Sequence, residues 1–240
     1  MKQPTSFMPH QVTDFDIPAE CKHIVVFVHG FGVRWDSRGM FPELKSALPK
    51  QWGSVLFDLY RPENNHVHVT TIEDQVKRLH RVLENTAQKA PGATIHLVAH
   101  SMGGIVTALA KPAAEGKIIL LAPPTRFGGR MKQYFSQYPG ATIEGEEIVV
   151  PRKDGSVTHI PYAFFDQTAN INPIMEIKAY AAEHPLHVVS ASNDEVLKDT
   201  DYESLEGAPG VTLTALPADH NFTGENRAQL VKQVCGILQD

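Results

Sequence analysis

The sequence has few cysteines and no cluster of basic residues. Only two cysteines occur among its 240 residues, Cys21 and Cys235, and they lie near opposite ends of the chain. They form no CxxC pair, so we expect two reduced, partly buried thiols rather than a disulfide. The formal net charge is −5, and no run of lysine and arginine appears. This charge balance argues against nucleic acid and against an anionic membrane as partners.

Long apolar segments are missing as well. No run is long enough to span a bilayer, and the first residues, MKQPTSFMPHQVTDF, lack the apolar core of a secretory signal. We therefore expect a cytoplasmic protein without a membrane span, although a chain trimmed of a leader would look the same. The hydrophobic fraction of 42% suits one large domain, residues 1–240, with a sizeable core.

Short apolar runs rich in β-branched residues alternate with helical patterns along most of the chain. The runs predict strands at 23–30, 54–60, 94–100, 117–124, 186–192 and 211–217. Helices are predicted at 71–90, from 102 to about 110 and from about 224 onward, with Thr71 and Asp74 resembling a capping box at the first of them. Unbroken apolar strands alternating with helices indicate an α/β fold with a mostly parallel central sheet covered by helices on both faces.

One region interrupts this alternation. Residues 125–184 separate two predicted strands by far more than a crossover helix needs, and we interpret them as a small inserted cap or lid. Five residues follow helical spacing within this region, four of them aromatic: Phe127, Met131, Tyr134, Phe135 and Tyr138. The later stretch EIVVPRKDGSVTHI places an Asp-Gly turn between two strand-like arms, which predicts a hairpin.

A lone serine stands at the end of the third predicted strand. Residues 95–104 read IHLVAHSMGG, so Ser101 separates an apolar run from a pair of glycines. A serine hydroxyl is a weak nucleophile that needs a neighbouring base and donors for an oxyanion. A sharp strand-to-helix turn exposes the hydroxyl at the positive end of a helix, but it requires small residues two positions to either side, here Ala99 and Gly103. The stretch resembles the nucleophile elbow G-x-S-x-G of the α/β-hydrolase fold, with Ala99 in place of the first glycine.

Three further stretches match the same family and extend the resemblance over nearly the whole chain. VFVHGFG (26–32) ends a strand at the loop that supplies an oxyanion-hole donor in the family, so the resemblance implies the backbone N–H groups of Phe31 and Met102. His29 precedes this loop and is expected to be structural. VVSASNDEV (188–196) offers Asp194 as the triad acid, with Glu195 as its rival, and LPADHNF (216–222) offers His220 as the base.

The resemblance implies an α/β-hydrolase that cleaves carboxylic esters of small to medium acyl or aromatic substrates through an acyl-enzyme. The catalytic residues are then Ser101, Asp194 and His220, and no cofactor is needed. Four cap residues, Phe127, Met131, Tyr134 and Phe135, are expected either to border the acyl pocket or to pack the cap onto the core. A thioesterase, an acyltransferase or a non-catalytic ligand-binding member of the fold stays open as an alternative, and the oligomeric state is not predicted.

Other motifs give weaker indications. HVHV (66–69) would project two histidines, His66 and His68, to one face of a strand, but no third metal ligand is evident in the sequence, and HPLH (184–187) is similar. The prediction is therefore that the protein holds no metal. VHGFG lacks the third glycine and the later acidic residue of a dinucleotide-binding fingerprint.

Overall fold

A seven-stranded sheet forms the centre of the computed structural model, which describes residues 12–128, 131–197 and 200–240. Its strand order is β1-β3-β2-β6-β7-β11-β12, and all neighbouring strands are parallel except the first pair. The strands are β1 (Val12–Asp16), β2 (His23–Val28), β3 (Gly53–Phe57), β6 (Thr94–His100), β7 (Ile118–Leu121), β11 (Leu186–Ala191) and β12 (Val211–Leu216). The mostly parallel sheet and all six of its predicted strands are confirmed. The added edge strand β1 was not predicted.

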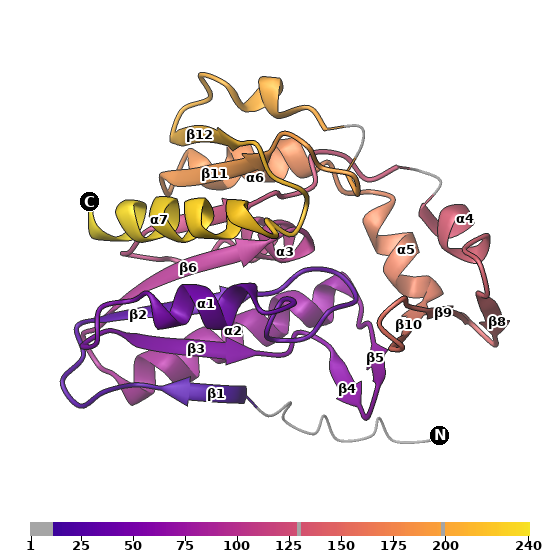
Figure 1. Ribbon diagram of the computed structural model, residues 1–240, viewed down its shortest axis with the longest axis horizontal. Helices are drawn as coiled ribbons and strands as arrows, with labels where there is room; N and C mark the ends of the chain where they lie inside the picture. The colour runs from indigo at the N-terminus through magenta and orange to yellow at the C-terminus, as the bar shows by residue number, and fades with distance from the viewer. Residues whose placement is uncertain (1–11, 129–130, 198–199) are drawn as a thin grey trace.

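Helices cover both faces of this sheet, as Figure 1 shows. Helices α1 (Met40–Ser46) and α7 (Glu225–Gln239) lie on one face, and α2 (Ile72–Lys89), α3 (Met102–Ala110) and α6 (Pro173–Ala181) lie on the other. Each face has its own buried cluster, because the side chains of the fully buried strands point alternately to the two sides. A short 3-10 helix, η1 (Tyr202–Leu205), precedes β12.

The N-cap half of the predicted capping box at α2 is present in the structure. The Thr71 hydroxyl accepts a hydrogen bond from the Asp74 backbone N–H at 3.2 Å and donates to the Asp74 carboxylate at 2.8 Å. Two donors at the helix start are thereby engaged locally, which explains why the helix begins at Ile72.

A second sheet lies beyond one end of the central sheet (Figure 1). Its order is β4-β5-β10-β9-β8, with β4 (Arg61–Glu63), β5 (His66–His68), β8 (Thr142–Glu144), β9 (Glu147–Pro151) and β10 (Val157–Pro161). The predicted hairpin around Asp154-Gly155 joins β9 to β10. Two strands of this sheet come from residues before α2, so the sheet joins the predicted insertion to an earlier part of the chain.

The remaining elements of residues 125–184 are the helices α4 (Met131–Ser136), α5 (Tyr162–Thr168) and α6. Helix α6 packs against α3 and thus belongs to the layer over the central sheet, whereas α4 and α5 lie beside the second sheet. Phe127 lies outside α4, because two glycines follow it in the sequence and glycine disfavours helix. Among the described residues, no helix is both apolar and long enough to cross a bilayer.

Candidate active site

Ser101 occupies a strained turn between β6 and α3. Its backbone adopts φ 52° and ψ −123°, a conformation that L-residues rarely adopt and that costs about 1–3 kcal/mol. The Ser101 N–H donates to the Leu121 carbonyl at 2.8 Å, which holds the turn against the neighbouring strand β7. The hydroxyl group therefore sits at the carboxyl end of a central strand and at the positive N-terminus of α3.

Close approach of the backbone explains the small residues around Ser101. A Cβ atom added at Gly103 would lie 2.3 Å from the Val28 carbonyl oxygen and 2.6 Å from that of His29. A Cβ at Gly104 would lie 3.1 Å from the Pro123 Cβ. The turn can pack against the end of β2 only because Gly103 has no side chain.

Three predicted site residues converge at this turn from the ends of three strands. His220 Nε2 lies 3.0 Å from Ser101 Oγ, and His220 Nδ1 lies 2.6 Å from Asp194 Oδ2. A carboxylate only accepts, so Nδ1 carries the proton and the Nε2 lone pair faces the serine hydroxyl. Ser101 and His220 are 7% and 5% exposed, so the hydroxyl and imidazole interact largely out of water.

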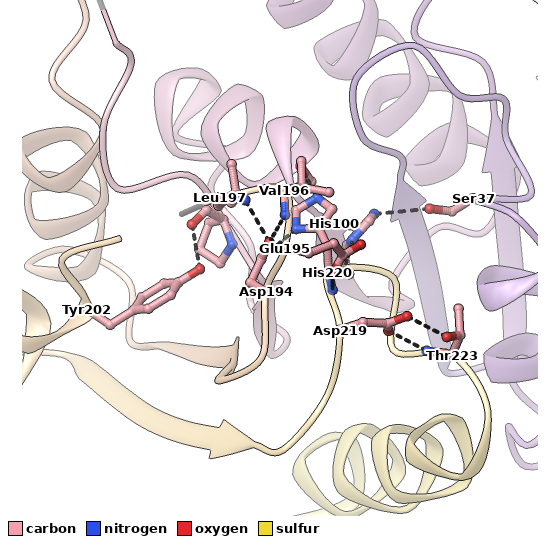
Figure 2. Close-up of polar contacts among 12 residues, drawn as sticks. Ser37, His100, Asp194, Glu195, Val196, Leu197, Tyr202, Asp219, His220 and Thr223 are labelled. Carbon is pink, nitrogen blue, oxygen red and sulfur yellow. Dashed lines mark hydrogen bonds and ion pairs between the residues drawn. The ribbon is translucent and has the colours of Figure 1, made fainter. Parts of the chain in front are cut away.

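Figure 2 shows how Asp194 is held at the start of its loop. Its Oδ1 accepts backbone hydrogen bonds from Val196 at 2.8 Å and from Leu197 at 2.7 Å, while Oδ2 faces His220. Burial raises the pKa of Asp194, but these hydrogen bonds outweigh it and hold the pKa below its ordinary value. The side chain is therefore an anion that can orient an imidazole and stabilise its protonated form.

The acids next to Asp194 and His220 in the sequence form other hydrogen bonds. Glu195 Oε2 accepts a hydrogen bond from the His220 backbone N–H at 3.1 Å, so it contacts the loop of the histidine and not the ring. Asp219 accepts from the Thr223 backbone N–H at 2.7 Å and from the Thr223 hydroxyl (Figure 2). The geometry thus places Asp194, and neither Glu195 nor Asp219, at the imidazole.

The loop after β2 passes beside Ser101. A Cβ added at Gly30 would lie 3.1 Å from the Ser101 Cβ, so Phe31 follows at the position implied for an oxyanion donor. Met102 is the first residue of α3, where backbone N–H groups have no acceptor within the helix. The side chain of Phe31 points to α4 and α5, with its ring centroid 5.2 Å from those of Phe135 and Phe164.

His29 has both ring nitrogens engaged by the backbone. Nδ1 donates to the Gly30 carbonyl at 2.9 Å, and Nε2 accepts from the Leu59 N–H at 2.8 Å. Burial is the main cause of a lowered pKa, which keeps this ring neutral. His29 therefore braces the loop before Phe31, in the structural role expected of it.

His100, immediately before the serine, was not singled out by the sequence. Its Nε2 lies 3.0 Å from the His220 backbone oxygen, so Nε2 carries the proton, and Nδ1 accepts from the Ser37 hydroxyl at 3.2 Å. Full burial lowers the pKa of His100 to about 3. This neutral ring links the loop of His220 to the segment before α1 (Figure 2), and only the adjacency to Ser101 could have suggested it.

The four predicted cap residues differ in placement. Phe127, Met131 and Phe135 are partly buried against the larger core cluster, and Phe135 also contacts Phe31. Tyr134 is 61% exposed and has its ring beside those of Phe135 and Tyr138. Phe127 additionally lines a cavity of about 330 Å³ together with Leu197, three residues from Asp194. Of the four, Phe135 contacts the ring of Phe31, and Phe127 lines a cavity beside the loop that follows Asp194.

Comparisons with known proteins agree with this architecture. Similar solved structures include Est1E from Butyrivibrio proteoclasticus, at 16% identity and a TM-score of 0.66 over 94% of this chain and 91% of that one. A monoacylglycerol lipase from Paleococcus ferrophilus matches at 16% identity and a TM-score of 0.67 over 96% and 98% of the two chains. The esterase domain of a Rhodothermus marinus protein matches at 15% identity and a TM-score of 0.63 over 92% and 89%.

These identities show the fold and no more. A comparison with curated proteins finds no match. The family model of the alpha/beta hydrolase family, in contrast, matches residues 25–233, which include the ends of β2, β6, β11 and β12 where the site lies. The chain belongs to the alpha/beta hydrolase family.

Proposed function

We propose that the protein is a serine hydrolase that cleaves carboxylic esters of small to medium acyl or aromatic substrates through an acyl-enzyme. The observation that carries the proposal is the hydrogen-bonded series Ser101–His220–Asp194, with heavy-atom distances of 3.0 and 2.6 Å. Structures of similar fold include an esterase domain and a monoacylglycerol lipase, which supports ester hydrolysis as the reaction class.

In the first half of the reaction, Ser101 Oγ attacks the ester carbonyl carbon while His220 Nε2 takes its proton. Asp194 keeps the imidazole in the required tautomer and stabilises the imidazolium. The backbone N–H groups of Phe31 and Met102 donate to the oxyanion, where the N-terminus of α3 adds a favourable potential. His220 then gives its proton to the departing alcohol.

In the second half, water replaces the alcohol. His220 removes a proton from the water as it attacks the acyl-enzyme, and the collapse of the second tetrahedral intermediate releases the acid and returns the proton to Ser101. The acyl group lies on the side of the cap, where Phe135 packs on Phe31 and Phe127 lines the cavity near Leu197. These apolar side chains favour an acyl or aromatic substituent over a charged one.

The test is a panel of nitrophenyl esters and acyl thioesters of matched chain length. We expect turnover of the esters by the wild-type protein and a loss of about 10⁶ in kcat for Ser101→Ala. Ser46→Ala is the matched control, because Ser46 is exposed on α1 and its hydroxyl donates to the Glu43 carbonyl of the same helix. Faster cleavage of thioesters at every chain length would assign the protein to the thioesterases instead. Absence of turnover in a folded wild-type protein would contradict catalysis altogether.

A further inference from the structure

A cluster of histidines and acids lies on the second sheet, outside the site described above. Three residues, His68, Glu147 and His159, each offer one ligand atom, and these three atoms lie within 4.8 Å of one another. His66 and Glu63 stand beside them: His66 Nδ1 is 2.8 Å from His159 Nε2, and Glu63 Oε2 is 3.8 Å from His68 Nε2. Three histidines are thereby gathered at one place in a chain whose mechanism uses none of them.

The pairing of the strands explains how these residues meet. His68 on β5 is the direct partner of His159 on parallel β10, and Glu147 on β9 is the partner of Pro161, two residues beyond His159. Alternation along each strand therefore places all three side chains on one face. The opposite face carries the fully buried Ile148, Val150 and Ile160, so the cluster lies on the outer, partly exposed face.

We propose that His68, His159 and Glu147 bind a divalent transition-metal ion, with Zn²⁺ the ion that fits best. Two imidazoles and one carboxylate form a ligand set typical of zinc, and they lack the all-oxygen coordination that Mg²⁺ and Ca²⁺ prefer. With three protein ligands, water would complete a tetrahedral site. The sequence had shown only the pair in HVHV, of which His68 is a ligand, and the other two ligands come from a distant part of the chain.

The distances between ligand atoms support this assignment. His159 Nδ1 lies 3.5 Å from Glu147 Oε2, beyond the range of about 2.7–2.9 Å for a charge-assisted hydrogen bond. Two ligands of one tetrahedral zinc, each bonded at about 2.0–2.1 Å, lie about 3.3 Å apart. The pair is thus spaced as ligands of a common ion. The rings of His68 and His159 lie with their centroids 4.2 Å apart, so His68 is close enough to be the third ligand. The rings are stacked at an interplanar angle of 19°, and a rotation of the His68 side chain is required to turn its lone pair toward the ion.

His66 accepts the hydrogen bond that a metal-bound histidine usually donates from its second ring nitrogen. When His159 Nδ1 binds the ion, its Nε2 carries the proton and donates to His66 Nδ1 at 2.8 Å. Such a bond fixes the ring and its tautomer, and its loss typically costs 10–100-fold in metal affinity. His66 and His159 are 93 residues apart in the sequence. A bound ion would consequently join β5, next to the core, to the hairpin of the cap.

The second sheet also contacts the loop beside Ser101. Thr158, on the inner face next to His159, accepts a hydrogen bond from Arg152 Nε at 2.9 Å, and a Cβ at Gly32 would lie 2.6 Å from Arg152 Nη2. The sheet that the ion joins therefore packs directly on the loop containing Phe31. Metal binding would stabilise the sheet that packs on this loop, and the ion would take no part in the reaction.

The test is titration of chelator-treated full-length protein with ZnCl₂ by calorimetry. We expect one Zn²⁺ per wild-type chain, a loss of affinity of at least about 100-fold in His68→Gln and Glu147→Gln, and a loss of about 10–100-fold in His66→Gln. His80→Gln, on α2 away from the cluster, is the matched control and should bind as wild type. His220→Gln should also bind as wild type, which separates this site from the serine site.

A thermal measurement keeps the test valid even if a variant is less stable than the wild-type protein. Zn²⁺ at about 100 times its dissociation constant should raise the wild-type Tm by about 5–10 °C. The same addition should leave the Tm of a His68→Gln/Glu147→Gln double variant unchanged, whatever its starting value. Equal zinc affinity and equal Tm shifts in the wild-type protein and the double variant would overturn the proposal, as would the lack of any zinc binding by the wild-type chain.

Discussion

Asp194 and Glu195 are neighbours in the sequence, but they contact different atoms of His220. Asp194 bonds the ring at 2.6 Å, whereas Glu195 bonds the backbone N–H at 3.1 Å. Asp194→Asn should lower kcat by about 10⁴, the loss seen when the equivalent acid of a serine protease is changed, because the wrong tautomer is then favoured. Glu195→Gln keeps an acceptor for the backbone and should retain activity within about tenfold. Steady-state kinetics of both variants test this ranking, and the reverse order would assign the acid role to Glu195.

His100 gives the folded protein a defined pH dependence of stability. The unfolded chain takes up this proton near pH 6.5, whereas the folded chain takes it up only at about 3, so the stabilising contribution is complete above pH 6.5 and is lost as the pH falls toward 3. Between about pH 6 and about pH 4.5 this group should remove about 2 kcal/mol from the free energy of unfolding.

The comparison variant is His100→Gln, whose amide reaches toward the His220 carbonyl without titrating. Urea unfolding across this pH range should show a shallower decline for His100→Gln than for the wild-type chain, and His80→Gln should decline as the wild type does. Parallel declines in all three proteins would show that His100 is not a buried neutral ring.

At the scale of elements, the turn between β6 and α3 depends on the missing side chain of Gly103. Gly103→Ala places a Cβ 2.3 Å from a backbone oxygen that cannot rotate away, so we expect about 3 kcal/mol of destabilisation and loss of ester turnover. Gly236→Ala in α7 is the control, because a Cβ there meets nothing within 4 Å and alanine favours helix by about 0.5–1 kcal/mol. Denaturant unfolding measures both, and similar stabilities would contradict the packing described for the elbow.

The elements of the central sheet were predictable because their apolar runs are long and their helices have clear boundaries. The N-cap at Thr71 and the Asp-Gly hairpin each combine a residue type with a local geometry, and both are present. The short strands β4 and β8 were not predicted, since a three-residue strand has no periodicity to read, and β5 was considered only as a strand that would carry the histidines of HVHV. They exist because they pair with strands far along the chain, and such pairing leaves no local signal.

The site shows the same difference between features with a local sequence signal and features that depend on distant contacts. Ser101, Asp194 and His220 each end or follow a recognisable strand, so the resemblance could indicate their positions, and the structure brings their side chains together. The roles of His100 and of Glu195 depend on contacts to the backbone of His220, which a sequence does not display.

At the scale of the whole molecule, α4 and α5 are joined to the core through the second sheet and through aromatic contacts. Because Phe135 packs on Phe31 and Phe127 borders the cavity near Leu197, trimming both to alanine should change the preferred acyl chain. A methylene in an apolar pocket contributes about 1–3 kcal/mol, so the ratio of kcat/KM for long and short esters should shift about tenfold or more. Tyr134→Ala, at a side chain 61% exposed, should leave the ratio unchanged.

Melting temperatures measured alongside separate this account from simple packing. If Phe127 and Phe135 only hold the cap on the core, the double variant melts lower and all esters slow in proportion. An unchanged chain-length profile with a lower Tm would therefore remove these residues from the acyl pocket.

The central claim is that Ser101 is an activated nucleophile, and covalent labelling tests it most directly. A fluorophosphonate probe reacts with a serine whose proton a neighbouring base removes, so the wild-type chain should gain one adduct, mapped by peptide mass spectrometry to Ser101. Ser101→Ala should gain none, and His220→Gln should label slowly, because the lone pair 3.0 Å from the hydroxyl is gone. A folded wild-type protein that stays unlabelled, or that carries the adduct on another serine, would contradict the account.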